Sequence, residues 1–343
     1  MEDGPQEWAA HAVVKGANEM IQRRIIVLAL GLIHLLACSS QEMNRIVAAL
    51  PSSPYVVFLG TAQDGGLPQV GCEGERCRRA RSEPEFARMV ASLMIVDPRS
   101  GKRWLIDATP DFDEQVQLAD RIAPQPVRVG RPPLFDGIFL THAHLGHYTG
   151  LASLGREAYG SERTPVWGSE RMGEFLSNNG PWKLLVEDEH IELHKIVPGE
   201  VIELSPGLSI SAFLVPHRDE YTDTLGFRVE GPSRSLIYIP DIDKWSEFET
   251  GIESLIMAND LALLDGSFFA DGEIPGRAMA EIPHPFMVES LERFAVMEKS
   301  ERNKIMFTHL NHTNPALDSG SPEAKKVYAV GIGIAIEGQF LEL

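Results

Sequence analysis

LTHAHLGHYTG, residues 140–150, places His142, His144 and His147 within a span of six residues. The apolar run GIFL at residues 137–140 leads directly into this stretch and predicts a short buried strand. Because His142 and His144 are two residues apart, an extended segment directs both side chains to the same side. Neutral imidazole is the commonest protein ligand for zinc and related cations, so the stretch predicts a metal site at the end of a strand.

Four more apolar runs along the chain end in a histidine or an aspartate. The run over residues 208–215 leads to His217, the run over 235–239 to Asp241, the run over 261–264 to Asp265, and the run over 304–308 to His309. Rigid strands position the side chains that follow them, so we expect these groups to converge in one crevice. His147, at the predicted start of a helix, could then serve a second ion.

THAHLGH resembles the H-x-H-x-D-H motif of metallo-β-lactamase-fold hydrolases, and the chain order of His217, Asp241 and His309 is similar to that of the remaining ligands in this family. Two further stretches, LGTAQDGGLPQVGC at residues 59–72 and HLNHTNPAL at residues 309–317, look like coenzyme PQQ synthesis protein B and its relatives. The resemblance runs from about Tyr55 to the C-terminus. It implies an α/β fold, the four-layer αββα sandwich of the metallo-β-lactamase family.

The resemblance also implies a site for two cations. The first would be held by His142, His144 and His217, and the second by His147 and His309, with Asp241 bridging the two. Asp107, in LIDATPD, matches the aspartate that supports the metal ligands from behind in that fold. The expected cofactor is Zn²⁺, as one or two ions, although histidine and carboxylate ligands suit Fe(II) as well.

Gly146 departs from the motif, because the family has an aspartate of the second metal site at this position. Glycine offers no ligand atom, so the second ion binds weakly, or one ion suffices, or another group replaces the carboxylate. The candidates for that replacement are Asp219, Glu220, Asp265 and His312. The loop QDGG at residues 63–66 borders the site in the resembled fold, where Asp64 could touch substrate or metal, or belong to a plain turn.

The resulting hypothesis is a metal-dependent hydrolase that acts on a small-molecule substrate. A bound cation lowers the pKa of water from about 15.7 to about 7, so hydroxide is available at neutral pH. Asp241 and His147 are the candidate catalytic residues, since Asp241 could orient the hydroxide or accept its proton. Two alternatives remain: an enzyme of PQQ biosynthesis, and a protein that has lost hydrolysis and binds a metal or a small molecule.

Cys72 and Cys77 lie in VGCEGERCRRA, residues 70–80. Relatives of the PQQ protein carry a cysteine-rich structural zinc site in this region, and His284, in EIPHPF, is the candidate for a further ligand. A disulfide between the two cysteines is an equal alternative if the protein works outside the cytoplasm. Two free thiols are the third possibility.

Residues 1–38 have the pattern of an export leader. Arg23 and Arg24 precede the apolar run IIVLALGLIHLLA, which is too short to span a bilayer comfortably. The run ends in LLAC, which resembles the lipobox of bacterial lipoproteins and predicts lipidation of Cys38. We therefore expect translation to start at Met20 and to give an exported lipoprotein, anchored to a membrane in the periplasm or cell envelope; an uncleaved anchor helix is the alternative.

The linker, the domain bounds and the other expected elements follow from the composition and from the positions of glycine and proline. Residues 39–54 read as a linker, and residues 55–343 as the metallo-β-lactamase-like domain. The net charge of −18 repels phosphate backbones and argues against nucleic acid as a main partner. The last strand is expected over residues 328–337. Helices are expected over residues 85–88, 111–118, 150–158, 170–177 and 287–299.

Overall fold

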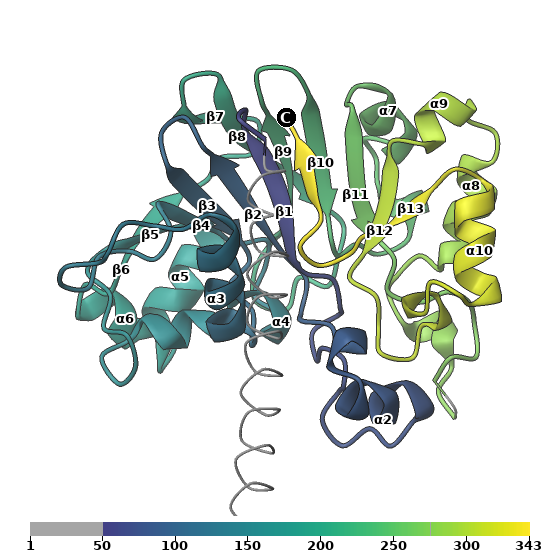
Figure 1. The fold of residues 1–343 in the computed structure, drawn as a ribbon, viewed down its shortest axis with the longest axis horizontal. Coiled ribbons are helices and arrows are strands. Elements are labelled where there is room, and N and C mark those ends of the chain that lie inside the picture. Colours follow the sequence, from purple (N-terminus) through teal and green to yellow (C-terminus); the bar gives the residue numbers. More distant parts are fainter. Residues whose placement is uncertain (1–50, 275) are drawn as a thin grey trace, which may run out of the picture. The chain divides into compact units, whose positions relative to one another are not determined.

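Two sheets of seven strands lie face to face in the part of the chain that the computed structural model describes, residues 51–274 and 276–343 (Figure 1). The first sheet runs in the order β14 (Phe340–Glu342), β1 (Tyr55–Gly60), β2 (Ser92–Asp97), β3 (Lys102–Ile106), β4 (Gly137–Phe139), β5 (Thr164–Gly168) and β6 (Ile191–Lys195). The second sheet runs in the order β13 (Gly333–Ile334), β12 (Ile305–Thr308), β11 (Leu261–Asp265), β10 (Ser235–Ile239), β9 (Thr224–Glu230), β8 (Leu208–Val215) and β7 (Val201–Ser205).

Both sheets are mixed, and the directions of their strands decide where the functional side chains meet. In the second sheet β10, β11 and β12 are parallel to one another. Strand β8 points the same way, because β9 is antiparallel to both β8 and β10. The carboxyl ends of these four strands therefore lie at one edge of the sheet, where the residues that follow them can converge.

The inner faces of the two sheets form the central core. Along β10, Leu236 and Tyr238 pack in the cluster between the sheets, whereas Ile237 and Ile239 pack in the cluster beneath the outer helices. All four side chains are almost completely buried. Successive side chains of a strand point to opposite faces, so a continuous apolar run is typical of a strand that is covered on both sides.

Helices cover the outer face of each sheet (Figure 1). Those on the side of the first sheet are α3 (Phe112–Ile122), α5 (Glu170–Asn178) and α6 (Trp182–Glu187), while α4 (Leu145–Tyr148) lies beyond the end of β4. Those on the side of the second sheet are α7 (Ile252–Met257), α8 (Met287–Phe294), α9 (Lys299–Arg302) and α10 (Pro322–Ala329), while α2 (Glu75–Ser82) follows β1 beyond its strand end. The expected four-layer αββα sandwich is thereby confirmed.

The expected last strand is wrong for most of its length. Helix α10 occupies the start of residues 328–337, and only Gly333–Ile334 form a strand. The Ser321 side chain accepts a hydrogen bond from the Ala324 N–H, and Pro322 occupies the first position of the helix. A capped helix start therefore outweighs the β-branched residues that suggested a strand.

The predicted leader, residues 1–38, and the predicted lipidation of Cys38 lie outside the described residues, as does most of the predicted linker, residues 39–54. The compact unit that carries the two sheets runs over residues 51–343. Within its described residues, none of the helices combines the length and the apolar character needed to cross a membrane.

Candidate metal centre

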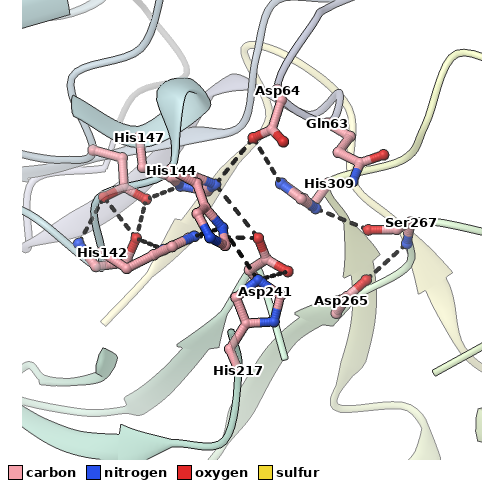
Figure 2. Close-up of polar contacts among 12 residues, drawn as sticks. Gln63, Asp64, His142, His144, His147, His217, Asp241, Asp265, Ser267 and His309 are labelled. Carbon is pink, nitrogen blue, oxygen red and sulfur yellow. Dashed lines mark hydrogen bonds and ion pairs between the residues drawn. The ribbon is translucent and has the colours of Figure 1, made fainter. Parts of the chain in front are cut away.

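Histidines and aspartates from five strand ends, from helix α4 and from the loop after β1 come together at a single edge of the two sheets (Figure 2). Strand β4 leads to His142 and His144, and α4 carries His147. The other strand ends contribute His217 after β8, Asp241 after β10, Asp265 at the end of β11 and His309 after β12. The convergence that the strand-end pattern predicted is present in the fold.

The first group of ligand atoms surrounds one point. His142 Nε2 lies 2.8 Å from His144 Nδ1, and His217 Nε2 lies 3.3 Å from the same nitrogen. Asp241 closes the group, with Oδ2 3.4 Å from His142 Nε2 and Oδ1 3.3 Å from His217 Nε2. Tetrahedral zinc with bonds of about 2.0–2.1 Å has ligand atoms about 3.3 Å apart. These four residues therefore have the spacing of a metal-ligand set.

A second group adjoins the first. Asp64 Oδ1 lies 3.4 Å from His147 Nε2 and 4.0 Å from His309 Nε2. His147 Nε2 also lies 3.7 Å from Asp241 Oδ2, the oxygen that faces His142 in the first group. The Asp241 carboxylate is thus placed between two groups of ligands, as a bridging carboxylate would be.

Unpaired polar atoms show that these residues fit a cation. Among the described residues, the buried atoms Asp64 Oδ1, His147 Nε2, Asp241 Oδ1 and His309 Nε2 have no hydrogen-bond partner. A buried polar atom without a partner costs about 1–3 kcal/mol, and native interiors contain few of them. A cation among Asp64 Oδ1, His147 Nε2 and His309 Nε2 would satisfy those three atoms together, and a cation beside His217 would satisfy Asp241 Oδ1, so the donor set matches the metal that the fold family implies.

Most of the imidazole rings are fixed from behind. The contacts are His142 Nδ1 to Thr141 Oγ1 at 3.0 Å, His147 Nδ1 to Asp107 Oδ2 at 2.7 Å, His217 Nδ1 to Asp243 Oδ1 at 2.8 Å and His309 Nδ1 to Ser267 Oγ at 2.9 Å. In His144 the two ring nitrogens have exchanged roles. Its Nε2 lies 3.1 Å from Glu220, and its Nδ1 faces His142 and the first group of ligand atoms. Such contacts orient a ring and set which nitrogen is available to a metal.

Two of these residues have unusual backbone angles. Asp107 has a φ of 67° and His309 a φ of 62°, in the left-handed region that few residues other than glycine adopt. Strained conformations of this kind cluster at functional sites, where the surrounding structure fixes them. Gly150 packs closely against the two residues that follow Asp107, because its N–H donates to the Ala108 carbonyl and a Cβ on Gly150 would lie 2.2 Å from the Thr109 carbonyl oxygen.

Burial and neighbouring charges shift the pKa values of the histidines in this site. Burial lowers the pKa of His142, and the neighbouring His147 lowers it further, which favours the neutral imidazole that binds metals. Burial also opposes the charged form of His217, but the Asp241 and Asp243 carboxylates outweigh burial and raise the pKa of His217 to about 10. A metal ion that binds His217 would therefore displace a proton, so metal affinity is expected to rise with pH.

His284 belongs to this site, and its expected place beside the cysteines is wrong. Its Nδ1 lies 2.8 Å from Asp265 Oδ2 and 3.2 Å from Asp241 Oδ1. The chain between β11 and α8 returns to the end of β11, where Phe268 forms a β-bridge with Phe286. No strand precedes His284 directly, so the strand-end pattern could not have placed it.

Only one of the four candidates for the missing carboxylate joins the cluster. Asp265 lies with Asp241 and His309, and it also accepts a hydrogen bond from the Ser267 N–H at 2.8 Å. Among the described residues, Asp219 and Glu220 belong to no shared ligand group, and His312 belongs to a group away from this centre. The loop residue Asp64 does take part, although the sequence left its role open between a turn and a contact.

A separate cluster joins the two cysteines with His312. The ligand atoms of Cys72, Cys77 and His312 lie within 4.8 Å of one another, and both thiols are free. The structure therefore has no disulfide between Cys72 and Cys77. Burial raises the pKa of the Cys77 thiol, and His312 Nδ1 is buried without a partner among the described residues. The third potential ligand of this cluster is His312 rather than His284.

The metal centre opens onto a cavity of about 850 Å³. Asp64, His144 and His284 line the side nearest the metal centre. The remaining wall includes the apolar residues Phe268, Ile274 and Ile282 and the basic residues Arg218 and Arg277. A small molecule in this cavity would lie against both the candidate metal ligands and two guanidinium groups.

Comparison with known families decides the classification. The sequence model of the beta-lactamase superfamily domain matches residues 102–310, a span that begins before Asp107 and ends after His309. The chain belongs to the β-lactamase superfamily. Its fold and the order of its histidines along the chain agree with this membership.

Within this superfamily, the chain is similar to PQQ synthesis proteins. Coenzyme PQQ synthesis protein B of Methylobacterium radiotolerans is 31% identical over 310 residues, which covers 84% of this chain and 99% of the relative. Zn²⁺-bound PqqB from Methylobacterium extorquens has a TM-score of 0.72 at 25% identity, over 84% of this chain and all of that protein. A diphosphatase of the PhnP family, with a TM-score of 0.57 and 24% identity, shares the fold. The resemblance to PQQ synthesis protein B is thus confirmed.

Proposed function

We propose that this protein is a metal-dependent hydrolase. The observation that carries the proposal is the convergence of three imidazole nitrogens, from His142, His144 and His217, on the buried carboxylate of Asp241. A second group of buried, unpaired ligand atoms lies directly beside them. The combined set would hold one or two ions, with Zn²⁺ the first choice and iron the alternative for the same ligand types.

A divalent cation held by these residues would lower the pKa of a water molecule and supply a nucleophile at neutral pH. Asp241 is buried between the two ligand groups, so its carboxylate can orient that water and accept its proton. His147 has its Nε2 among the ligand atoms, so in this proposal it holds a cation rather than transfers a proton.

His284 adds a proton donor on the cavity side. Burial opposes its charged form, but the Asp265 and Asp241 carboxylates outweigh burial and raise its pKa. Asp265 holds Nδ1 of the ring, while Nε2 lies 3.3 Å from Gln63 Nε2 at the wall of the cavity. The Gln63 amide nitrogen donates to Nε2 in this arrangement, so in this proposal His284 protonates a leaving group only after that contact is broken and Nε2 carries the proton.

The cavity favours an anionic small molecule. Arg218 and Arg277 line it, in a chain whose net charge is −18, and guanidinium groups bind carboxylates and phosphates with matched geometry. Phe268 and Ile282 offer an apolar surface to the rest of the substrate. The proposed substrate is an anion that contains an ester, amide, thioester or phosphoester bond and an apolar group.

A role in PQQ synthesis is the second candidate. It is favoured by the match to PQQ synthesis protein B of Methylobacterium radiotolerans, which extends over 99% of that protein. Expression of this chain in a strain that lacks its own PQQ synthesis protein B tests the candidate. Restored PQQ production would support it, and unchanged deficiency with soluble, metal-loaded protein would contradict it.

The hydrolase proposal is tested by metal content and turnover together. His142→Ala is expected to lose bound metal while the fold, measured by circular dichroism, is retained. It is also expected to lose turnover on a panel of phosphodiesters, lactones, lactams and thioesters. His194→Ala is the matched control, because this histidine stacks on Trp167 away from the cluster. Unchanged metal content in His142→Ala would rule out the ligand assignment, and a metal-filled wild type without turnover would favour a binding protein.

A further inference from the structure

Asp64 lies in the loop after β1, and this loop is fixed to the strand end that carries His309. The Gln63 N–H donates to the Leu310 carbonyl at 3.0 Å. Asp64 Oδ1 lies 3.4 Å from His147 Nε2 and 4.0 Å from His309 Nε2 (Figure 2). Backbone contacts thus hold a carboxylate against the second group of ligands, although this carboxylate lies far from the histidine motif in the sequence.

Asp64 occupies the space that a side chain at position 146 would need. A Cβ built on Gly146 would lie 2.1 Å from Asp64 Oδ1 and 2.7 Å from Asp64 Cα, closer than Cβ atoms approach other atoms in proteins. Gly146 lies in α4 and is not among the residues with a positive φ, so its backbone does not require glycine. The presence of the Asp64 carboxylate explains why position 146 carries no side chain.

The ligand atoms of this group are buried and unpaired. Among the described residues, Asp64 Oδ1, His147 Nε2 and His309 Nε2 have no hydrogen-bond partner, although the Asp64 side chain as a whole is 38% exposed. Removing a carboxylate oxygen and two imidazole nitrogens from water is unfavourable unless a cation or proton lies among them. Their arrangement therefore indicates a cation that these three atoms bind together.

We propose that Asp64 is a ligand of the second cation and replaces the aspartate that the metallo-β-lactamase motif has at the position of Gly146. This inference rests on the proposed function, because it assigns one ligand of the same metal centre. The second site then consists of Asp64, His147 and His309, with Asp241 shared between the two sites. The carboxylate comes from the loop after β1 instead of α4, so the chain keeps a two-cation centre without the aspartate of the motif.

The test is the metal content of full-length variants after equilibration with Zn²⁺, measured by elemental analysis and expressed relative to the wild type. Asp64→Ala is expected to lose about one ion per chain, as is His147→Ala, because each removes a ligand of the second site. Gly146→Ala removes no ligand but is expected to lose the same ion, since its methyl group displaces the Asp64 carboxylate. Asp219→Ala is the matched control, an aspartate outside the ligand groups, and is expected to keep the wild-type content.

The outcomes separate this inference from the proposed function. If His147→Ala loses an ion and Asp64→Ala keeps it, the assignment of Asp64 is overturned while the metal centre stands. If His217→Ala loses an ion and neither Asp64→Ala nor His147→Ala does, the assignment of Asp64 is again overturned while the metal centre stands. If neither histidine variant lowers the metal content, the metal centre itself fails. Should Asp64→Ala or Gly146→Ala not fold, Asp64→Asn keeps the size of the side chain and replaces its charge, and its Zn²⁺ content decides in the same way.

Discussion

Asp107→Asn is expected to weaken the second cation site and to leave the first nearly unchanged. Asp107 is completely buried, and its Oδ2 accepts the hydrogen bond of His147 Nδ1 at 2.7 Å. Its Oδ1 accepts from the Thr141 N–H at 2.8 Å and from the Thr141 hydroxyl at 3.0 Å. Asparagine keeps the Oδ1 that accepts from Thr141 and tolerates the φ of 67°. The main change is therefore at the contact with His147, and the 3.0 Å contact of the Thr141 hydroxyl with Oδ2 is the one route by which the change can reach His142.

The size of the effect follows from that contact. Asparagine presents an amide N–H where the carboxylate oxygen accepted a hydrogen bond, so His147 either loses its partner or moves its proton to Nε2, the ligand atom. A hydrogen bond to a charged group contributes about 1.5–3 kcal/mol, and about 1.4 kcal/mol corresponds to a tenfold change in affinity. Loss of a partner behind a metal ligand typically costs about 10–100-fold in affinity. We therefore expect a loss of about 10–100-fold at the second site.

The measurement is a Zn²⁺ titration of the metal-free protein in competition with a chromophoric chelator, which yields a dissociation constant for each site. Asp243→Asn is the matched variant for the first site, because Asp243 Oδ1 lies 2.8 Å from His217 Nδ1 in the same way. Each variant is expected to weaken its own site and to change the other by less than about threefold. If Asp107→Asn weakened both sites equally, or neither, the division into two ligand groups would be refuted.

Two further predictions concern residues outside the metal centre. Burial raises the pKa of Glu337 from its ordinary value of 4.5 to about 7. The folded protein therefore binds this proton more tightly than the unfolded chain does. The free energy of unfolding is expected to fall by up to about 3 kcal/mol as the pH rises from about 4.5 to above 7. Urea unfolding of metal-free Glu337→Gln is expected to lack this decline. His312→Ala is expected to make Cys72 and Cys77 react faster with a thiol reagent after equilibration with Zn²⁺, whereas His284→Ala is expected to leave their reactivity unchanged.

The outcomes that contradict these predictions are equally direct. A decline in stability that is the same in wild type and Glu337→Gln would show that another group titrates in this range. Thiols that react equally fast in wild type and His312→Ala, with or without a chelator, would show that the cysteine cluster holds no metal through that histidine.

The positions of the histidines and of Asp241 could be predicted from the sequence because each follows directly from a local pattern. Apolar runs identify strands, and a polar residue just after such a run lies at a strand end. His142, His217, Asp241 and His309 all satisfy this rule, and the parallel directions of β10, β11 and β12 bring the ends of these strands to one edge. The four-layer fold followed from the same runs together with the resemblance of the histidine motif.

Only the tertiary structure decided which further side chains lie at the two groups of ligands in the metal centre. Gln63 and His284 are in contact although 221 residues separate them, and neither they nor Asp64 follow a strand in a way that reveals a functional role. The loop after β1 reaches the second group of ligands because it is hydrogen-bonded to Leu310, and it fits there because Gly146 leaves space for a carboxylate. Contacts between such distant segments depend on the packing of the two sheets and on excluded volume, which no local pattern of residues encodes.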